Sequence, residues 1–280
     1  MNFQKKLDKI VKKNNSLLCI GLDCEFENIH ERFKRFINPQ FEFNKWIIDQ
    51  TFGLVCGYKP NSAFYEAQGA EGIEQLKLTC DYIKKNHPEI PVILDAKRGD
   101  IGNSNEGYIK YAFEYLQTDA ITFHPYLGIE SLKPFFKMAN KGFFILCRTS
   151  NPGSGELQNL TVTHTDHSLN DRTLNGQQLL LYQYIARQVS WKWNEFGNCM
   201  LVVGATYPVE LADVRKIVGD ITILAPGIGT QGGDVEKTVK AGINSKKAGL
   251  IINSSRSIIF SENPQKEARK LRDEINKFRK

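Results

Sequence analysis

The stretch PVILDAKRGD, residues 91–100, decides the fold of this 280-residue chain. It opens with a short apolar run of the kind that forms strands, and it ends with two carboxylates and two cations. Apolar residues recur at helical spacing before it, over Glu71–Asn86, and a second helical pattern follows over Glu106–Gln117. A short apolar strand between two helices is the repeating unit of a parallel sheet.

The same kind of apolar run occurs eight times along the chain. Each run is bounded by Gly, Pro, Asn or Asp, which favour turns. The runs are Leu17–Leu22, Leu54–Tyr58, Pro91–Leu94, Ala120–Phe123, Gly142–Cys147, Met200–Val203, Ile221–Leu224 and Gly249–Ile252. Most gaps between them hold a helical pattern, as in Pro208–Val218 and Asp234–Ala241. Eight such units predict an α/β fold of the (β/α)8 TIM-barrel type, which takes about 250 residues.

A doubly wound sheet is the alternative way to alternate strands with helices. Its glycine-rich fingerprint should follow the first strand. Here that strand ends in GLD, residues 21–23, without a G-x-G-x-x-G pattern. Neither an internal repeat nor a linker to a second domain is visible, and we therefore expect residues 1–280 to form a single domain.

One gap between strands is much longer than the others, and it predicts an insertion over about residues 151–198. It begins with the turn-rich NPGSGE and ends with a helical pattern over Gly176–Trp193. His164 and His167 lie in its polar middle, where no carboxylate or cysteine pattern frames them as metal ligands. A binding lid and a tolerated surface insertion are both compatible with such a loop.

Composition argues against several classes of protein. The net charge of +6 is mild, and many lysines lie on amphipathic helical patterns such as Phe3, Leu7, Ile10 and Val11, so we expect no nucleic-acid partner. No apolar run approaches the ~18 residues of a membrane span, and the N-terminus has no signal-peptide core. The six cysteines form no C-x-x-C pair. We expect a cytoplasmic protein that does not bind a membrane.

Charged residues gather where the third predicted strand ends, which is the active-site face of a barrel. Asp95 and Lys97 share one face of this strand because side chains alternate, and Asp100 follows a glycine that permits a sharp turn. Two carboxylates around one ammonium favour the protonated lysine, which suits proton donation rather than Schiff-base chemistry. Lys59 adds a second cation at the end of a neighbouring strand. A purely structural ion-pair network is the alternative interpretation.

Two segments near the C-terminus have the features of a phosphate site. The seventh strand runs into APGIGTQGGD, residues 225–234, and the eighth into NSSR, residues 253–256. Barrels often bind phosphate in these two loops, where glycines let backbone N–H groups approach the anion. Arg256 can offer two parallel hydrogen bonds to it. Glycines in ordinary turns would explain either segment by itself. They explain poorly why both segments follow strands at the positions where barrels bind phosphate.

Together these motifs resemble the orotidine 5′-phosphate decarboxylase family. The resemblance rests on LDAKRGD with GLD before it, on Lys59, and on PGIG followed by Arg256. GYKPNSAFYE and CRTSNPGSGE resemble the branch of the family that has longer chains and a long insertion after the fifth strand. The resemblance to the family covers roughly residues 5–260.

The resemblance implies an activity and its catalytic residues. A homodimer without metal or cofactor would convert orotidine 5′-phosphate to uridine 5′-phosphate and CO2, the last step of de novo UMP biosynthesis. Lys59, Asp95, Lys97 and Asp100 would form the catalytic charged array. Lys97 would protonate C6 of the pyrimidine as CO2 leaves, while the site stabilises the C6 carbanion electrostatically. Asp95 would face the substrate carboxylate, and Asp100 would reach the neighbouring subunit's site.

The resemblance also implies a set of residues that bind the substrate. Asp23 would hold the ribose hydroxyls, and Gln231 and Arg256 would grip the phosphate. The whole implied set is Asp23, Asn61, Thr149, Ser150, Pro226, Gln231, Gly232, Ser255 and Arg256.

Two other functions fit part of the pattern. Metal-dependent sugar-phosphate decarboxylases, aldolases or epimerases share D-x-K-x-x-D, but they need a metal-binding carboxylate at a neighbouring strand end, where this chain has Lys59. A nucleotide-binding barrel that has lost catalysis is the non-enzymatic alternative. An intact Lys97 with both aspartates argues against it.

Overall fold

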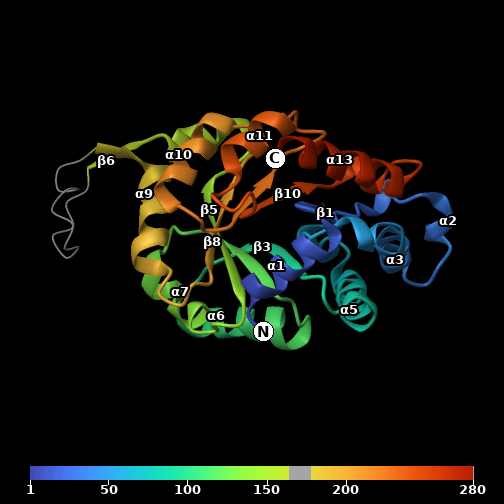
Figure 1. Ribbon diagram of the computed structural model, residues 1–280. Coiled ribbons are helices and arrows are strands. Elements are labelled where there is room, and N and C mark those ends of the chain that lie inside the picture. Colours follow the sequence, from blue (N-terminus) through green and yellow to red (C-terminus); the bar gives the residue numbers. More distant parts are fainter. Residues whose placement is uncertain (164–177, 280) are drawn as a thin grey trace.

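Eight short parallel strands form the centre of the computed structural model (Figure 1). The structure describes residues 1–163 and 178–279. The strands are β1 (Leu18–Gly21), β2 (Gly57–Lys59), β3 (Ile93–Arg98), β4 (Ala120–Phe123), β5 (Gly142–Arg148), β8 (Cys199–Val203), β9 (Ile223–Pro226) and β10 (Leu250–Ser254). Each overlaps one of the eight apolar runs, which confirms that the runs are strands.

The sheet closes on itself through a seam between β2 and β3. Hydrogen-bonded neighbours follow the order β2-β1-β10-β9-β8-β5-β4-β3. Its two outermost strands are then joined by isolated parallel bridges, Tyr58 to Val92 and Asn61 to Asp95. The Asp95 N–H donates to the Pro60 carbonyl at 2.9 Å. The predicted (β/α)8 barrel is confirmed, and the doubly wound alternative is wrong because an open sheet would leave these edges apart.

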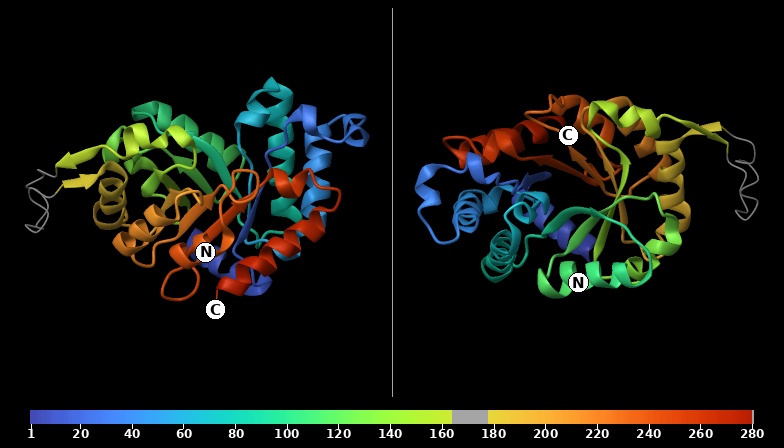
Figure 2. Two further views of the ribbon diagram at one scale, coloured as in Figure 1. Left: turned by 90° about the horizontal axis from the view of Figure 1, so that it is seen from above. Right: turned by 180° about the vertical axis from the view of Figure 1, so that it is seen from behind.

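Helices surround the barrel, as Figure 2 shows from two further sides. The longer ones are α1 (Phe3–Asn14), α3 (Pro39–Thr51), α5 (Gly69–Asn86), α6 (Gly102–Ile109), α7 (Gly128–Phe136), α9 (Leu181–Gln188), α10 (Pro208–Val218), α11 (Val235–Gly242) and α13 (Pro264–Phe278). Short ones are η1 (Phe26–Asn28), α2 (Glu31–Lys34), η2 (Phe52–Leu54), α4 (Ala63–Glu66), η4 (Pro152–Ser154), α8 (Gly155–Gln158) and α12 (Arg256–Ile259), and π-helical turns η3 (Lys110–Tyr115) and η6 (Val189–Trp193) extend α6 and α9. No described helix has the length and apolarity needed to cross a membrane.

The N-terminal helix α1 packs against the barrel at the end opposite to the strands' carboxyl ends. The side chain of Asn2 caps it by accepting from the Lys5 N–H at 3.0 Å. Its apolar face is buried, as the sequence predicts, and the Phe3 ring meets the Phe144 ring of β5 edge-on at 5.6 Å. A Cβ on Gly142 would lie 2.7 Å from the Phe3 ring, so the first residue of β5 is a glycine where helix and strand approach closely.

The insertion after β5 differs from its predicted form at one point. Residues 161–163 (β6) and 178–180 (β7) pair as antiparallel strands, and Figure 1 shows β6 projecting beside α9. The helix predicted over Gly176–Trp193 therefore starts late, at Leu181, because cross-strand pairing with β6 holds β7 extended. The prediction is confirmed from Leu181 onward by α9 and η6. Residues 164–177, with both histidines of the insertion and the start of the predicted helix, lie outside the described residues.

Candidate active site

A cavity of about 760 Å³ opens at the carboxyl ends of the barrel strands. It lies on the face that the sequence analysis singled out. Among the predicted site residues, those that line it are Asp23, Lys59, Asn61, Asp95, Lys97, Thr149, Ser150, Pro226, Gln231, Ser255 and Arg256. Two predicted residues, Asp100 and Gly232, are not among the described residues that line the cavity.

One carboxylate in the cavity wall bridges two ammonium groups. Asp95 Oδ2 lies 2.7 Å from Lys59 Nζ, and Asp95 Oδ1 lies 2.7 Å from Lys97 Nζ. The Lys59 side chain is only 4 % exposed, whereas that of Lys97 is 48 % exposed. Lys59 is therefore a buried counter-charge, and Lys97 is the ammonium group that a bound molecule can reach.

Asp95 and Lys59 are each held in the ionised form by neighbouring charges. Burial by itself would lower the pKa of Lys59, but the carboxylates of Asp95 and Asp23 outweigh it and hold this pKa above its ordinary value. Burial would likewise raise the pKa of Asp95, but Lys59 and Lys97 outweigh it and hold this pKa well below its usual range. Asp95 and Lys59 are thus both charged at neutral pH.

Thr122, in β4, completes this cluster and was missed by the sequence analysis. Its hydroxyl donates to Asp95 Oδ1 at 2.9 Å and accepts from the backbone N–H of Lys97, also at 2.9 Å. A threonine inside the apolar run Ala120–Phe123 was the available signal. Strand propensity explains that threonine equally well, so the sequence alone does not single it out.

Asp100 lies apart from the other three members of the predicted array. Its backbone N–H donates to Asn105 Oδ1 at 3.0 Å, and its Oδ1 accepts from the Ile101 N–H at 2.7 Å. Within the described residues no ion pair joins Asp100 to a lysine. Gly99, with φ of +143°, turns the chain just before it. One chain therefore brings together three of the four predicted members.

The predicted phosphate loops face each other across one end of the cavity. Gly227 and Gly229 have φ of +107° and +92°, conformations that other residues rarely adopt, and the Gly233 N–H donates back to the Gly227 carbonyl at 3.0 Å. Arg256 begins α12, is exposed, and forms no ion pair with any described residue. Its guanidinium is thus available to an anion. The Ser255 hydroxyl instead donates to the Gly21 carbonyl at 3.0 Å, tying this loop to β1.

Two buried oxygens in the cavity wall have no hydrogen-bond partner within the described residues. They are Oδ1 of Asp23, which follows β1, and Oδ1 of Asn253, in β10. Buried polar atoms are normally paired, so these two oxygens are candidates to accept from a bound molecule. Asn253 was not among the predicted site residues, because an asparagine at the end of a strand is most simply read as a turn residue.

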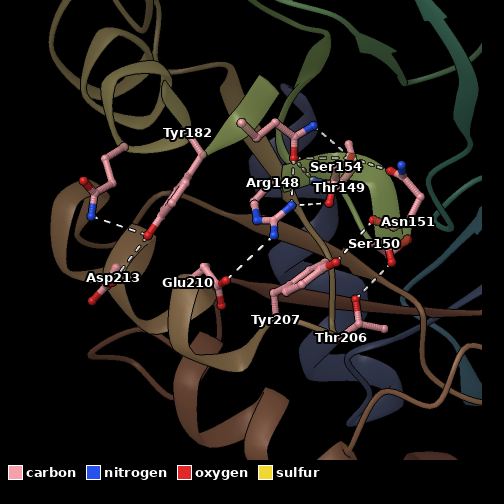
Figure 3. A network of polar contacts seen from close by, with 12 residues as sticks. Arg148, Thr149, Ser150, Asn151, Ser154, Tyr182, Thr206, Tyr207, Glu210 and Asp213 are labelled. Carbon is pink, nitrogen blue, oxygen red and sulfur yellow. Dashed lines mark hydrogen bonds and ion pairs between the residues drawn. The ribbon is translucent and has the colours of Figure 1, made fainter. Parts of the chain in front are cut away.

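The loop after β5 is held in place by the buried side chain of Arg148 (Figure 3). Its guanidinium lies 3.8 Å from the centre of the Tyr207 ring and donates to Gln158 Oε1 at 3.3 Å. It also donates to the Ser154 hydroxyl. Gln158 Nε2 in turn donates to the Thr149 hydroxyl at 2.9 Å. The predicted substrate residue Thr149 is therefore oriented through Gln158, and the guanidinium anchors that loop to the start of α10.

The fold and this cavity define a class of protein: a (β/α)8-barrel enzyme with a Lys–Asp–Lys cluster in its cavity and a glycine-rich loop beside an exposed arginine, Arg256, in the same cavity. The chain belongs to the orotidine 5′-phosphate decarboxylase / HUMPS family, whose model matches residues 16–271. The family predicted from the sequence is confirmed.

Individual proteins agree with this assignment. The chain is 46 % identical to the orotidine 5′-phosphate decarboxylase of Cellvibrio japonicus, over 94 % of this chain and 91 % of that protein. The structure of OMP decarboxylase from Leishmania donovani matches all of this chain and 99 % of its own, with 38 % identity and a TM-score of 0.84. The structure of UMP synthase from the same organism matches with 39 % identity and a TM-score of 0.87, but this chain spans only 57 % of it.

Replacing Arg148 with methionine should destabilise the fold. Arg148→Met keeps a long side chain of similar reach. It removes the guanidinium, and with it the contact to the Tyr207 ring and the hydrogen bonds to the loop after β5. We expect the free energy of unfolding to fall by about 2 kcal/mol or more. The free energy of unfolding is measured by urea titration, with circular dichroism as the signal. Arg35→Met, at an exposed arginine beside α2, is the control and should change it by less than about 0.5 kcal/mol. Equal effects would contradict the anchoring role.

Proposed function

We propose that this chain decarboxylates orotidine 5′-phosphate to uridine 5′-phosphate and CO2, the last step of de novo UMP biosynthesis. The observation that carries the proposal is the Lys59–Asp95–Lys97 cluster, with both ion pairs at 2.7 Å, in the cavity of a barrel from this family. The relatives that bear the name of this activity are matched over nearly their full length, which supports it.

The reaction requires electrostatic rather than covalent catalysis. When the bond between C6 and the carboxylate breaks, its electron pair stays on C6, where no conjugated group can accept it. Lys97 is the reachable ammonium of the cluster and can stabilise this carbanion, then transfer one Nζ proton to C6. Asp95, facing the substrate carboxylate, disfavours the bound substrate relative to the transition state. Neither step asks for a metal or a cofactor.

The remaining predicted residues bind the rest of the substrate. Asp23 offers its unpartnered Oδ1 to the ribose hydroxyls. Arg256 takes the phosphate, which lies away from the reacting carbon and supplies remote binding energy. Gln231 binds the phosphate with Arg256, and Asn61, Thr149 and Ser150 lie near the ribose or the pyrimidine. The remaining substrate-binding residues are Pro226, Gly232 and Ser255.

We further propose a homodimer in which Asp100 completes the array of the partner subunit. Asp100 lies outside its own cavity, next to the exposed Ile101 (65 % exposed), and two further exposed apolar residues follow the neighbouring strand β4: Tyr126 (88 %) and Leu127 (45 %). Exposed apolar residues commonly mark protein interfaces.

The six cysteines support a cytoplasmic location for this protein. All six are free and buried, which suits a reducing compartment such as the cytoplasm.

Decarboxylation itself tests the proposed function. The purified chain should consume orotidine 5′-phosphate, followed by the loss of its absorbance, and should do so equally in the presence of EDTA. Lys97→Ala should abolish turnover, since both the stabilising charge and the proton source disappear, and circular dichroism should show an unchanged fold. Activity that EDTA removes and a divalent ion restores would favour the metal-dependent sugar-phosphate alternative. Near-normal turnover of folded Lys97→Ala would refute the mechanism.

Arg256→Ala tests the phosphate site. Two hydrogen bonds to a charged group contribute about 1.5–3 kcal/mol each, so kcat/KM should fall on the order of 10²–10⁴-fold. The measurement compares orotidine 5′-phosphate with phosphate-free orotidine for wild type and variant. The fall in kcat/KM should be much smaller for orotidine, because orotidine has no phosphate for Arg256 to bind. Equal losses on both substrates would show that Arg256 does not act through the phosphate.

Hybrid dimers test the shared site. Asp100→Asn and Lys97→Ala proteins should each be inactive. After mixing, one of the two sites in a hybrid dimer combines wild-type Lys97 with wild-type Asp100 of the partner, so activity should reappear. Subunit exchange is followed with one protein carrying an affinity tag. Exchange without recovered activity would contradict a contribution of Asp100 across the interface.

A further inference from the structure

Thr122 links two residues on which the proposed reaction depends. It is 1 % exposed, and its hydroxyl lies between the backbone of Lys97 and the carboxylate of Asp95, at 2.9 Å from each. A hydroxyl has one proton. Because the Lys97 N–H already donates to the oxygen, the Thr122 proton is left to donate to Asp95 Oδ1. The direction of both hydrogen bonds follows from this geometry.

The Asp95 carboxylate is therefore held by three donors. Lys59 Nζ binds Oδ2, while Lys97 Nζ and the Thr122 hydroxyl bind Oδ1. Thr122 is the uncharged member of this set, and it comes from β4, whereas the two lysines come from β2 and β3. The orientation of the carboxylate plane thus depends on all three strands.

The backbone of Lys97 needs support that regular strand pairing does not provide. Lys97 has φ of +47°, a left-handed conformation that is unfavourable for a residue with a side chain. The register between β3 and β4 shifts between Leu94 and Arg98, so the regular ladder is interrupted at this point. The Lys97 N–H donates to the Thr122 hydroxyl instead. This contact holds the turn from which the Lys97 side chain starts.

A buried threonine elsewhere in the same fold behaves differently. The hydroxyl of Thr118, also fully buried, donates to the backbone carbonyl of Ala112 at 2.9 Å. Such a bond only satisfies a local carbonyl. The hydroxyl of Thr122 makes its two bonds to the charged cluster and lines the cavity, which separates it from a threonine with a packing role.

We propose that Thr122 is a positioning residue for the decarboxylation, which holds the Lys97 ammonium and the Asp95 carboxylate in the arrangement required when CO2 leaves and the proton is transferred. This inference rests on the proposed function and extends it. Because Thr122 acts through its neighbours, its loss should reduce the chemical step much more than it reduces binding of the ribose and the phosphate.

Three variants test the proposal. Thr122→Val keeps the shape and removes the hydroxyl, Thr122→Ser keeps the hydroxyl and removes the methyl group, and Thr118→Val is the matched control for loss of a buried hydroxyl. The measurements are kcat and KM for orotidine 5′-phosphate, the inhibition constant of the product uridine 5′-phosphate, which lacks the carboxylate, and the thermal unfolding midpoint.

We expect Thr122→Val to lower kcat about tenfold or more, as for the loss of a hydrogen bond to a charged group, while KM and the inhibition constant change less than about threefold. Thr122→Ser should recover most of kcat. Thr118→Val should lower the unfolding midpoint and leave kcat near that of the wild type. Should Thr122→Val fail to fold, the smaller Thr122→Ala gives the same comparison with the same expected loss.

Specific outcomes would overturn the inference. Full kcat in folded Thr122→Val would show that the hydroxyl is dispensable. Equal losses in the Val and Ser variants, or a parallel weakening of product binding, would show a general structural role. A wild-type chain that does not decarboxylate orotidine 5′-phosphate would instead refute the proposed function, and this inference with it.

Discussion

The carboxylate of Asp95 accepts from two ammonium groups at 2.7 Å in the wall of the barrel, and the rest of the site is arranged around that contact. Removing charges from water is costly unless each is paired, and breaking such a buried pair by deleting one partner is strongly destabilising. Changing Asp95 or Lys59 therefore removes the nearest counter-charge of the other, at 2.7 Å. The exposed member, Lys97, is thereby held beside the cavity by its ion pair with Asp95.

The same contact lies where the barrel closes, between β2 and β3. Isolated bridges replace a regular ladder between these two strands, and one of them pairs Asn61 with Asp95. The ion pair between Lys59 and Asp95 crosses this seam next to the bridge. The pairing of Lys59 with Asp95 therefore requires a closed barrel, since β2 and β3 must meet for these two charges to pair. The cluster is thus built on strands, which hold side chains more precisely than loops do.

Some elements were predictable from local pattern, and others, among them helix α3, were not. The eight apolar runs predict the strands because an apolar run bounded by turn residues depends only on its neighbours in sequence. Helix α3 was not anticipated, because its buried face includes polar residues. Gln40 and Asn44 lie on that face, where the side-chain amide nitrogen of Gln40 donates to the Cys24 and Phe64 carbonyls and that of Asn44 donates to the Tyr65 hydroxyl. Because these buried positions are polar, an apolar periodicity does not develop in the sequence.

For the site, the sequence by itself determined which chemical groups stand at the ends of the strands: Lys59, Asp95, Lys97 and Arg256 each follow or end an apolar run. Only the tertiary structure decided how they combine. It placed Thr122 against Asp95 and Lys97, left the Asn253 oxygen without a partner among residues 1–163 and 178–279, and put Asp100 outside its own cavity. The reason is physical: residue type and strand ends are local properties. Register between strands and the direction of a loop are set by contacts between residues far apart in the chain.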